Sequence, residues 1–148
     1  MRTRSLGLTL ICLLGVATVS STLQAQAGKP VPSHDKSCQV NVPDNWEAMG
    51  SFGIANAPDK SMDVAVSSPH SSPTLASLKQ TAQMIYTGDK VVKDTASEFQ
   101  MEGQGMSGKP NVYRGIQLPG KVCIVEVTYS NDDIDSARKI ALSLKSAK

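Results

Sequence analysis

Residues 121–145 read KVCIVEVTYSNDDIDSARKIALSLK, and their hydrophobic pattern changes its period halfway along. Residues 122–125 are all apolar and residues 125–129 alternate between apolar and polar, which predicts a β-strand whose successive side chains point to opposite faces. Over 132–145 apolar residues recur every three or four positions and predict an amphipathic helix, with Asn131 as a candidate N-cap. The C-terminal part is therefore predicted to be a strand followed by a helix that packs on a sheet.

The two faces of the strand at 121–130 differ in composition. One face carries Cys123, Val125, Val127 and Tyr129, and the other carries Val122, Ile124, Glu126 and Thr128. Since Cys38 is in phase with Val40 and Val42 in an earlier predicted strand, both cysteines lie on apolar faces, and the Cys123 face is predicted to pack in the core. The Glu126 face is then either covered by another element or left open as an apolar patch around one carboxylate.

Similar patterns predict the rest of an α+β domain in which helices cover an antiparallel sheet. Apolar spacing predicts a helix from Thr74 to Gly88, with Thr74 or Ser72 as its cap, and Trp46 is expected to anchor the core. Further strands are expected at Cys38–Val42, around Phe52 and Ile54, at Met62–Val66, at Val91–Met101 and at Asn111–Leu118.

The first 27 residues have the features of a secretory signal peptide. Arg2 and Arg4 precede an apolar run over 6–19, and the segment ends in a small-x-small pattern at Ala27. Cleavage after Ala27 and a periplasmic location are therefore expected. The polar, proline-bearing residues 28–37 are predicted to be a flexible leader, and residues 38–148 a single α+β domain.

Charge excludes two classes of partner. Loss of Arg2 and Arg4 with the signal would leave 13 of the 15 basic residues, which equals the 13 acidic residues. A neutral domain lacks the basic excess that nucleic-acid binding or attachment to anionic lipid requires. We therefore expect neither nucleic acid nor a stable membrane association.

Two cysteines, Cys38 and Cys123, would remain in the exported chain. In an oxidising compartment such a pair predicts a disulfide, although two buried thiols are the alternative. A bond between them would close a loop of about 85 residues, for which the chain-entropy model gives about 4–5 kcal/mol of stabilisation.

Residues suited to catalysis are sparse. His70 lies among Ser68, Ser71 and Ser72 in a loop, but no strained nucleophile turn or oxyanion-hole motif accompanies it. A solvated loop histidine is therefore the favoured interpretation, and we expect a protein that is not an enzyme.

The sequence also predicts no cofactor and no metal site. Residues 131–135 gather three aspartates, but they lack the spacing of a calcium loop and suit the start of a helix instead. Neither Cys38 nor Cys123 has a neighbouring histidine that would complete a zinc site.

The order of elements resembles a known family. A short strand runs into Val42-Pro43-x-x-Trp46, a central helix follows, and a strand pair around Gly108-Lys109-Pro110 to Tyr113 leads to a closing helix. Over roughly residues 38 to 146 this order is similar to the PsbP-like fold, including the DcrB-like periplasmic proteins. The resemblance implies a binding or assembly role rather than catalysis.

Within that family, the size, export signal and neutral charge are similar to periplasmic immunity proteins. Such proteins block a peptidoglycan-degrading effector, here of muramidase type, delivered by type VI secretion. The resemblance implies a monomer that forms a 1:1 heterodimer with the effector. It does not decide whether a calcium ion takes part in that interface. The alternatives are an envelope-assembly or other periplasmic binding module and an inhibitor of host lysozyme. The residues predicted to contact the partner are Glu126, Ile124, Val122, Met106, Gln104, His70 and Ser71.

Overall fold

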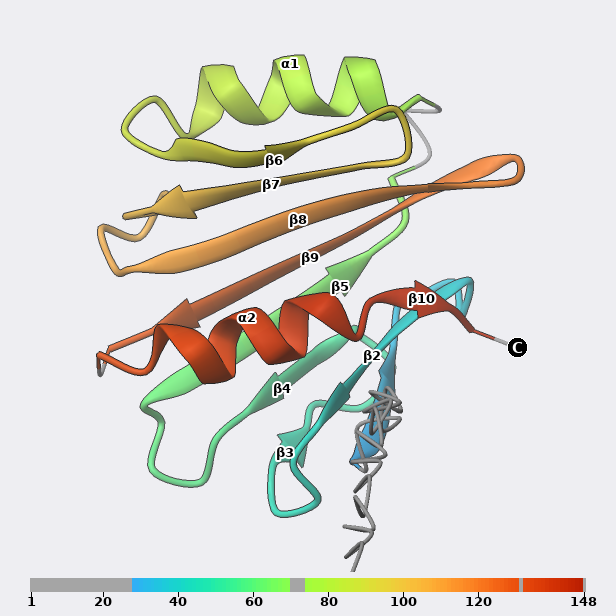
Figure 1. Cartoon of the computed structure of the whole chain (residues 1–148). Coiled ribbons are helices and arrows are strands. Elements are labelled where there is room, and N and C mark those ends of the chain that lie inside the picture. The colour runs from blue at the N-terminus through green and yellow to red at the C-terminus, as the bar shows by residue number, and fades with distance from the viewer. Residues whose placement is uncertain (1–27, 70–73, 131, 148) are drawn as a thin grey trace, which may run out of the picture.

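In the computed structural model, residues 28–69, 74–130 and 132–147 are described, and they form ten strands and two helices (Figure 1). The expected signal peptide over 1–27 lies outside these residues. In chain order the elements are β1 (Lys29–Pro32), β2 (Cys38–Val42), β3 (Glu47–Ala48), β4 (Ile54–Asn56), β5 (Met62–Ser67), α1 (Leu75–Ile85), β6 (Lys90–Asp94), β7 (Glu98–Gly103), β8 (Asn111–Leu118), β9 (Lys121–Tyr129), α2 (Ile134–Leu142) and β10 (Lys145–Ser146).

Seven strands form one large antiparallel sheet in the order β3-β4-β5-β9-β8-β7-β6. Its centre is the β8–β9 hairpin, whose two-residue turn at Pro119-Gly120 places Gly120 at a φ of 75°. Only glycine adopts that conformation without strain, so the turn fixes the hairpin register. The predicted α+β class with antiparallel strands and helices is confirmed.

The prediction of a flexible leader over residues 28–37 is wrong for the first half of that segment. Residues Lys29–Pro32 form β1, which pairs with β2, and Val31 is buried at 2 % exposure. Pro30 and Pro32 are tolerated because β1 is an edge strand, where every second N–H points away from the sheet. With β10 these strands make a second sheet in the order β1-β2-β10.

The two helices cover opposite faces of the large sheet (Figure 1). Helix α1 begins at Thr74, whose hydroxyl accepts from the Ser77 amide at 3.3 Å, and it packs on β7 and β8. Helix α2 begins at Asp133, whose carboxylate accepts from the Ser136 amide at 3.0 Å, and it packs on β8, β9 and β2. The candidate cap Asn131 lies outside the described residues.

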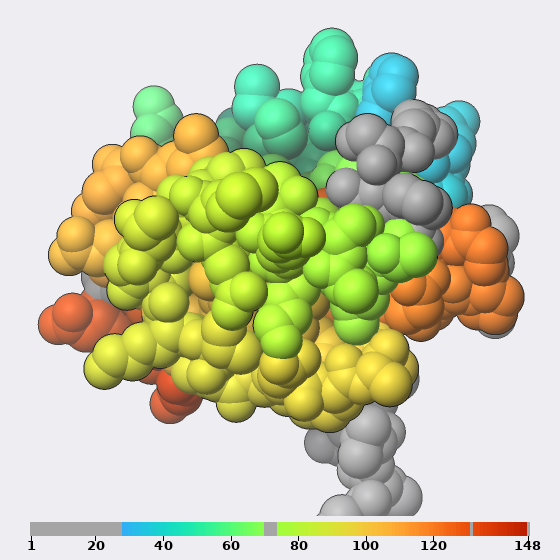
Figure 2. Space-filling view, turned by 90° about the horizontal axis from the view of Figure 1, so that it is seen from above, coloured from blue at the N-terminus to red at the C-terminus, as the bar shows by residue number. Residues whose placement is uncertain are grey.

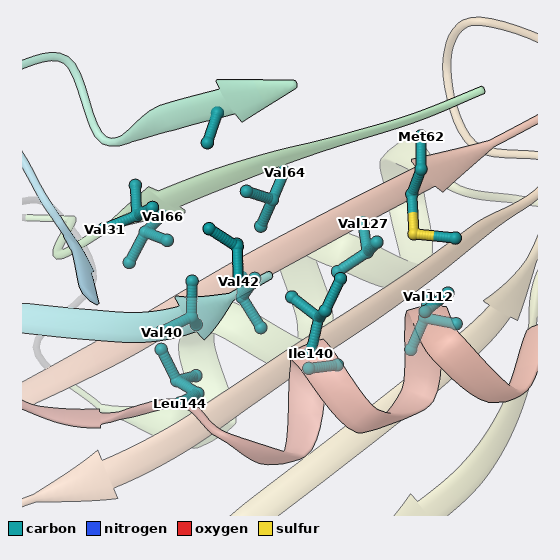
Figure 3. Close-up of a cluster of buried hydrophobic side chains, with 14 of the residues drawn as sticks. Val31, Val40, Val42, Met62, Val64, Val66, Val112, Val127, Ile140 and Leu144 are labelled. Atoms are coloured by element: carbon teal, nitrogen blue, oxygen red, sulfur yellow. The ribbon is translucent and has the colours of Figure 1, made fainter. Parts of the chain in front are cut away.

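The main core lies between the large sheet, the small sheet and α2 (Figure 3). Side chains from all three meet there, including Val125 and Val127 of the β9 face that was predicted to pack in the core, and Trp46 is buried at 6 % exposure as expected. The close-up shows valines of β2 and β5 facing Ile140 of α2.

Two strand predictions need correction. The strand expected over 91–101 is two strands, β6 and β7, because the Thr95 amide donates to the Glu98 carbonyl at 2.8 Å and turns the chain. Phe52 belongs to a turn and is 68 % exposed, so β4 begins only at Ile54.

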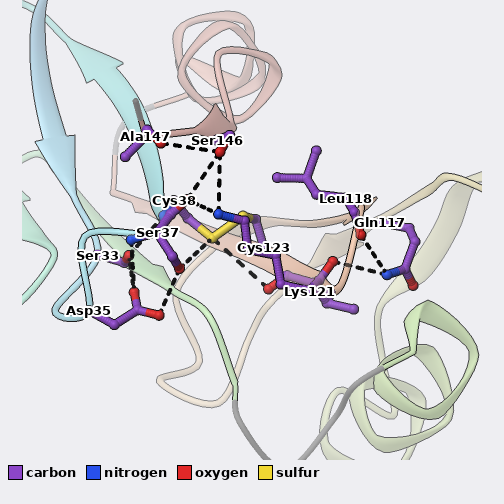
Figure 4. The surroundings of a disulfide bond; sticks show 11 residues. Ser33, Asp35, Ser37, Cys38, Gln117, Leu118, Lys121, Cys123, Ser146 and Ala147 are labelled. Atoms are coloured by element: carbon purple, nitrogen blue, oxygen red, sulfur yellow. Dashed lines mark hydrogen bonds between the residues drawn. A yellow bond between two sulfur atoms is a disulfide. The ribbon is translucent and has the colours of Figure 1, made fainter.

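The predicted disulfide is present between Cys38 of β2 and Cys123 of β9 (Figure 4). Both residues are fully buried, and their Cα atoms are 5.7 Å apart. The bond joins the small sheet to the large one. Beside it, the Lys121 ammonium donates to the Ser37 carbonyl at 2.7 Å and makes a second link between the sheets.

Charged side chains fix α2 to the large sheet. Arg114 of β8, 8 % exposed, donates to the Ala141 carbonyl near the end of α2 at 2.9 Å and pairs with Glu98. Arg138 of α2 makes a two-pronged bond to Glu102 of β7, at 2.8 and 2.7 Å. Hydrogen bonding to Arg138 holds the pKa of the Glu102 carboxyl below its usual value.

Candidate functional site

Helix α1 covers most of the sheet face that carries Glu126. Val122 and Ile124 are buried at 1 % and 8 % exposure in a cluster with Leu78 of α1. The prediction that these two residues contact a partner is therefore wrong, and the covered alternative holds for this part of the face. Strand alternation places residues on a face but does not show which element packs on it.

Glu126 lies beyond the end of α1 and has two hydrogen-bond partners. Its Oε2 accepts from the Tyr86 hydroxyl at 3.0 Å. Its Oε1 accepts from the side-chain amide nitrogen of Asn111 (Nδ2) at 3.1 Å. Tyr86 follows the last residue of α1, and Asn111 is the first residue of β8 and is fully buried. The carboxylate predicted to contact a partner is thus half-buried and held within its own domain.

The β7–β8 loop (residues 104–110) passes over this carboxylate. Asp89, just after α1, accepts from the amides of Gln104 and Gly105 through Oδ1, at 2.9 and 3.4 Å. A Cβ atom added to Gly105 would lie 2.9 Å from the Asn111 side-chain nitrogen and 3.3 Å from Glu126 Oε1. Gly105 also has a φ of 50°, which side-chain-bearing residues rarely adopt. The loop therefore requires glycine there, because it packs directly on the polar groups beneath it.

The same loop presents exposed side chains at the C-terminal end of α1 (Figure 2). Met106 is 75 % exposed, and Gln104 and Lys109 are exposed as well. Of the predicted contact residues, the structure thus brings together Glu126, Gln104 and Met106. His70 and Ser71 lie outside the described residues.

Three residues that support the loop, namely Tyr86, Asp89 and Asn111, are absent from the sequence prediction. Asp89 directly follows Gly88, and Asn111 directly follows Pro110. A polar residue beside a turn is the signal that could have identified these two. Nothing local marks Tyr86, since it is 40 residues from Glu126.

The tyrosines in this region have raised pKa values. The rings of Tyr86 and Tyr113 are 5.0 Å apart. Burial raises the pKa of both hydroxyls well above the ordinary value, and the negative charge of Glu126 raises it further. Burial also raises the pKa of Tyr129, the third tyrosine of the chain.

We expect these raised pKa values to destabilise the fold in alkaline solution. Unfolded tyrosines lose their protons near pH 10, whereas the folded protein keeps them. Stability is therefore unaffected below about pH 10 and falls as the pH rises further, because the unfolded state then binds fewer protons. The ultraviolet absorbance of tyrosinate should appear together with loss of circular dichroism. A tyrosinate signal near pH 10 in a fully folded sample would contradict this expectation.

The cluster around Glu126 consists of hydrogen bonds from a tyrosine hydroxyl and a side-chain amide to one carboxylate. Among residues 28–69, 74–130 and 132–147, no three histidine, cysteine, aspartate or glutamate side chains converge as metal ligands. Within the same described residues, neither helix has the length and apolar character needed to cross a bilayer. The buried disulfide is compatible with an extracytoplasmic location.

Comparison with known proteins gives likenesses in structure but none in sequence. No family model and no curated protein matches the chain. Solved structures similar to it include that of LpqN, described as involved in cell envelope biogenesis of Mycobacterium tuberculosis, at 17 % identity and a TM-score of 0.42. The match covers 81 % of this chain and 90 % of LpqN. The resemblance to PsbP-like proteins and to immunity proteins stays a prediction.

Proposed function

We propose that this chain is a periplasmic binding protein that inhibits a secreted peptidoglycan-degrading enzyme of muramidase type, as an immunity protein against a type VI secretion effector. The supporting observation is the β7–β8 loop, which is exposed at its tip and fixed at its base. In this proposal the contact residues are Gln104, Met106 and Lys109, and Glu126 positions the loop from below.

Fixing the base of the loop favours binding. A flexible loop loses conformational freedom when it meets a partner, at a cost of about 0.5–1.5 kcal/mol for each side chain that becomes ordered. Asp89 already holds the first half of this loop to the domain through the backbone amides of Gln104 and Gly105. Met106, an adaptable apolar side chain at 75 % exposure, is then available as a central anchor.

The charge of the loop suits a glycosidase cleft. Such enzymes carry a pair of carboxylates on either side of the bond they cleave. The loop sequence QGMSGKP contains Lys109 and no acidic residue. We therefore assign to Lys109 the pairing with these carboxylates.

We expect Met106→Glu and Lys109→Glu each to weaken binding and inhibition on the order of 30-fold or more, as loss of a central anchor does. The full chain would be produced in bacteria and titrated into a panel of purified muramidases, both bacterial and lysozyme-type, that digest a cell-wall suspension. Met49→Glu and Lys145→Glu are the matched controls, because both residues are exposed and lie outside the loop.

The panel also separates the alternatives. Inhibition of bacterial muramidases supports the immunity role, and inhibition of lysozyme-type enzymes alone supports the host-lysozyme alternative. Absence of inhibition throughout the panel would favour an envelope-assembly module. Inhibition that survives both loop substitutions would refute the loop as the contact site.

A further inference from the structure

A concave site lies at the other side of the sheet, away from the β7–β8 loop. It is a half-open groove of about 630 Å³ between the β2–β3 turn, the β4–β5 turn and the first two turns of α2. A volume of this size accommodates a ligand of a few hundred daltons. The disulfide-linked strand β2 forms one of its walls through Val42.

The floor of the groove is apolar. Val42, Trp46, Met62 and Ile140 line it, and each is buried at 6 % exposure or less. Figure 3 shows Val42, Met62 and Ile140 directed toward one another from β2, β5 and α2. Because these side chains belong to the main core, the floor is rigid and preformed.

The rim of the groove is polar and carries both donors and acceptors. Asp59 accepts from the Ser61 amide and hydroxyl, and Asp133 accepts from the Ser136 amide. A carboxylate has about four lone-pair sites, so both aspartates can also accept from a ligand. Donors stand beside them at Asn45 and Lys139.

We propose that this groove binds a neutral saccharide. A pyranose ring presents an apolar C–H face, which matches the floor. Its hydroxyl groups both donate and accept, which matches a rim where two carboxylates alternate with an amide and an ammonium. Half of the 14 lining residues are polar, more than a purely apolar ligand such as a fatty acyl chain would require.

The charges of the rim disfavour other ligands. Asp59 and Asp133 outnumber Lys139, so phosphate or an acidic peptide would meet net repulsion. The groove faces the α2 side of the sheet, whereas the β7–β8 loop lies over Glu126 on the α1 side at Gly105. Saccharide binding therefore stands independently of the proposed inhibition, and loss of one activity would leave the other measurable.

Trp46 provides the test, since it is the only tryptophan of the chain and lines the groove. The full chain would be titrated with chitotriose and with maltotriose, both uncharged, while tryptophan fluorescence is recorded. We expect a saturable change with at least one of them. Asp59→Ala should weaken binding at least fivefold, and Ser136→Phe, which fills the groove, should abolish it. Asp44→Ala is the matched control, because Asp44 is exposed beside the groove but does not line it.

Thermal unfolding of each variant would establish whether its fold is intact. If Ser136→Phe fails to fold, the comparison of Asp59→Ala with the wild type still tests the proposal. Binding that depends on Asp59 and leaves Asp44→Ala unchanged supports the proposal. The proposal is overturned if neither trisaccharide gives a saturable change, or if the change persists in folded Ser136→Phe. Saturable binding of dodecanoate or inorganic phosphate alone would likewise overturn it.

Discussion

Replacing Cys38 and Cys123 by alanine is expected to lower the free energy of unfolding by about 4–5 kcal/mol and the Tm by roughly 15 °C. The bond closes a loop with a sequence separation of 85, so its loss releases a large part of the unfolded chain from constraint. The effect is large because a domain of this size is stable by only about 5–15 kcal/mol.

Urea denaturation of the wild type and the double variant measures the change directly. Reduced wild type serves as the control, since breaking the bond without removing either side chain should reproduce most of the loss. Intact-mass measurement without reductant identifies the bond itself through the two missing hydrogens. Equal unfolding midpoints for the oxidised wild type and the variant would contradict the expected contribution.

The disulfide also has a place in the proposed saccharide site. Cys38 begins β2, and the same strand ends at Val42 on the floor of the groove. The small sheet is otherwise held to the large one by side-chain packing and by contacts such as that of Lys121 with Ser37. The double variant is therefore expected to lose saccharide binding at temperatures where its β8–β9 hairpin is still folded.

Periodicity in the sequence placed the central residues of the fold correctly. Cys123 and Val125 lie in the main core because they share one face of β9 with Val127 and Tyr129. The same reasoning missed β1, where Val31 is the only residue of the strand that becomes buried. A single apolar residue between two prolines gives no hydrophobic periodicity from which a strand could be predicted. That this segment pairs with β2 becomes apparent only in the folded structure.

The candidate site was predicted only in part, for a similar reason. A carboxylate within an apolar strand marked Glu126 as unusual, and the structure places it at the centre of a polar cluster. Its partners Tyr86 and Asn111 come from 40 and 15 residues away, so no local pattern joins them. The sequence therefore identified the residue, whereas its role beneath the loop depends on tertiary contacts.

Helix α1 connects the stability of the domain to this loop. Tyr86 follows α1 and donates to Glu126, so the position of α1 sets the position of the polar cluster. Phe99 of β7 is fully buried between α1 and the sheet. A Cβ at Gly115 would lie 2.7 Å from the Phe99 ring and 3.0 Å from Leu78, so the packing here is close.

Phe99→Ala is accordingly expected to lower the free energy of unfolding by about 3–5 kcal/mol, because it opens a cavity in a closely packed layer. Phe52→Ala is the matched control. The chain has only these two phenylalanines, and Phe52 is 68 % exposed, so its removal should change stability by about 0.5 kcal/mol or less. Urea denaturation measures both. Similar losses for the two variants would mean that α1 does not pack on Phe99. A loss confined to Phe99→Ala, together with weaker inhibition by that variant, would indicate that α1 holds the β7–β8 loop in its binding conformation.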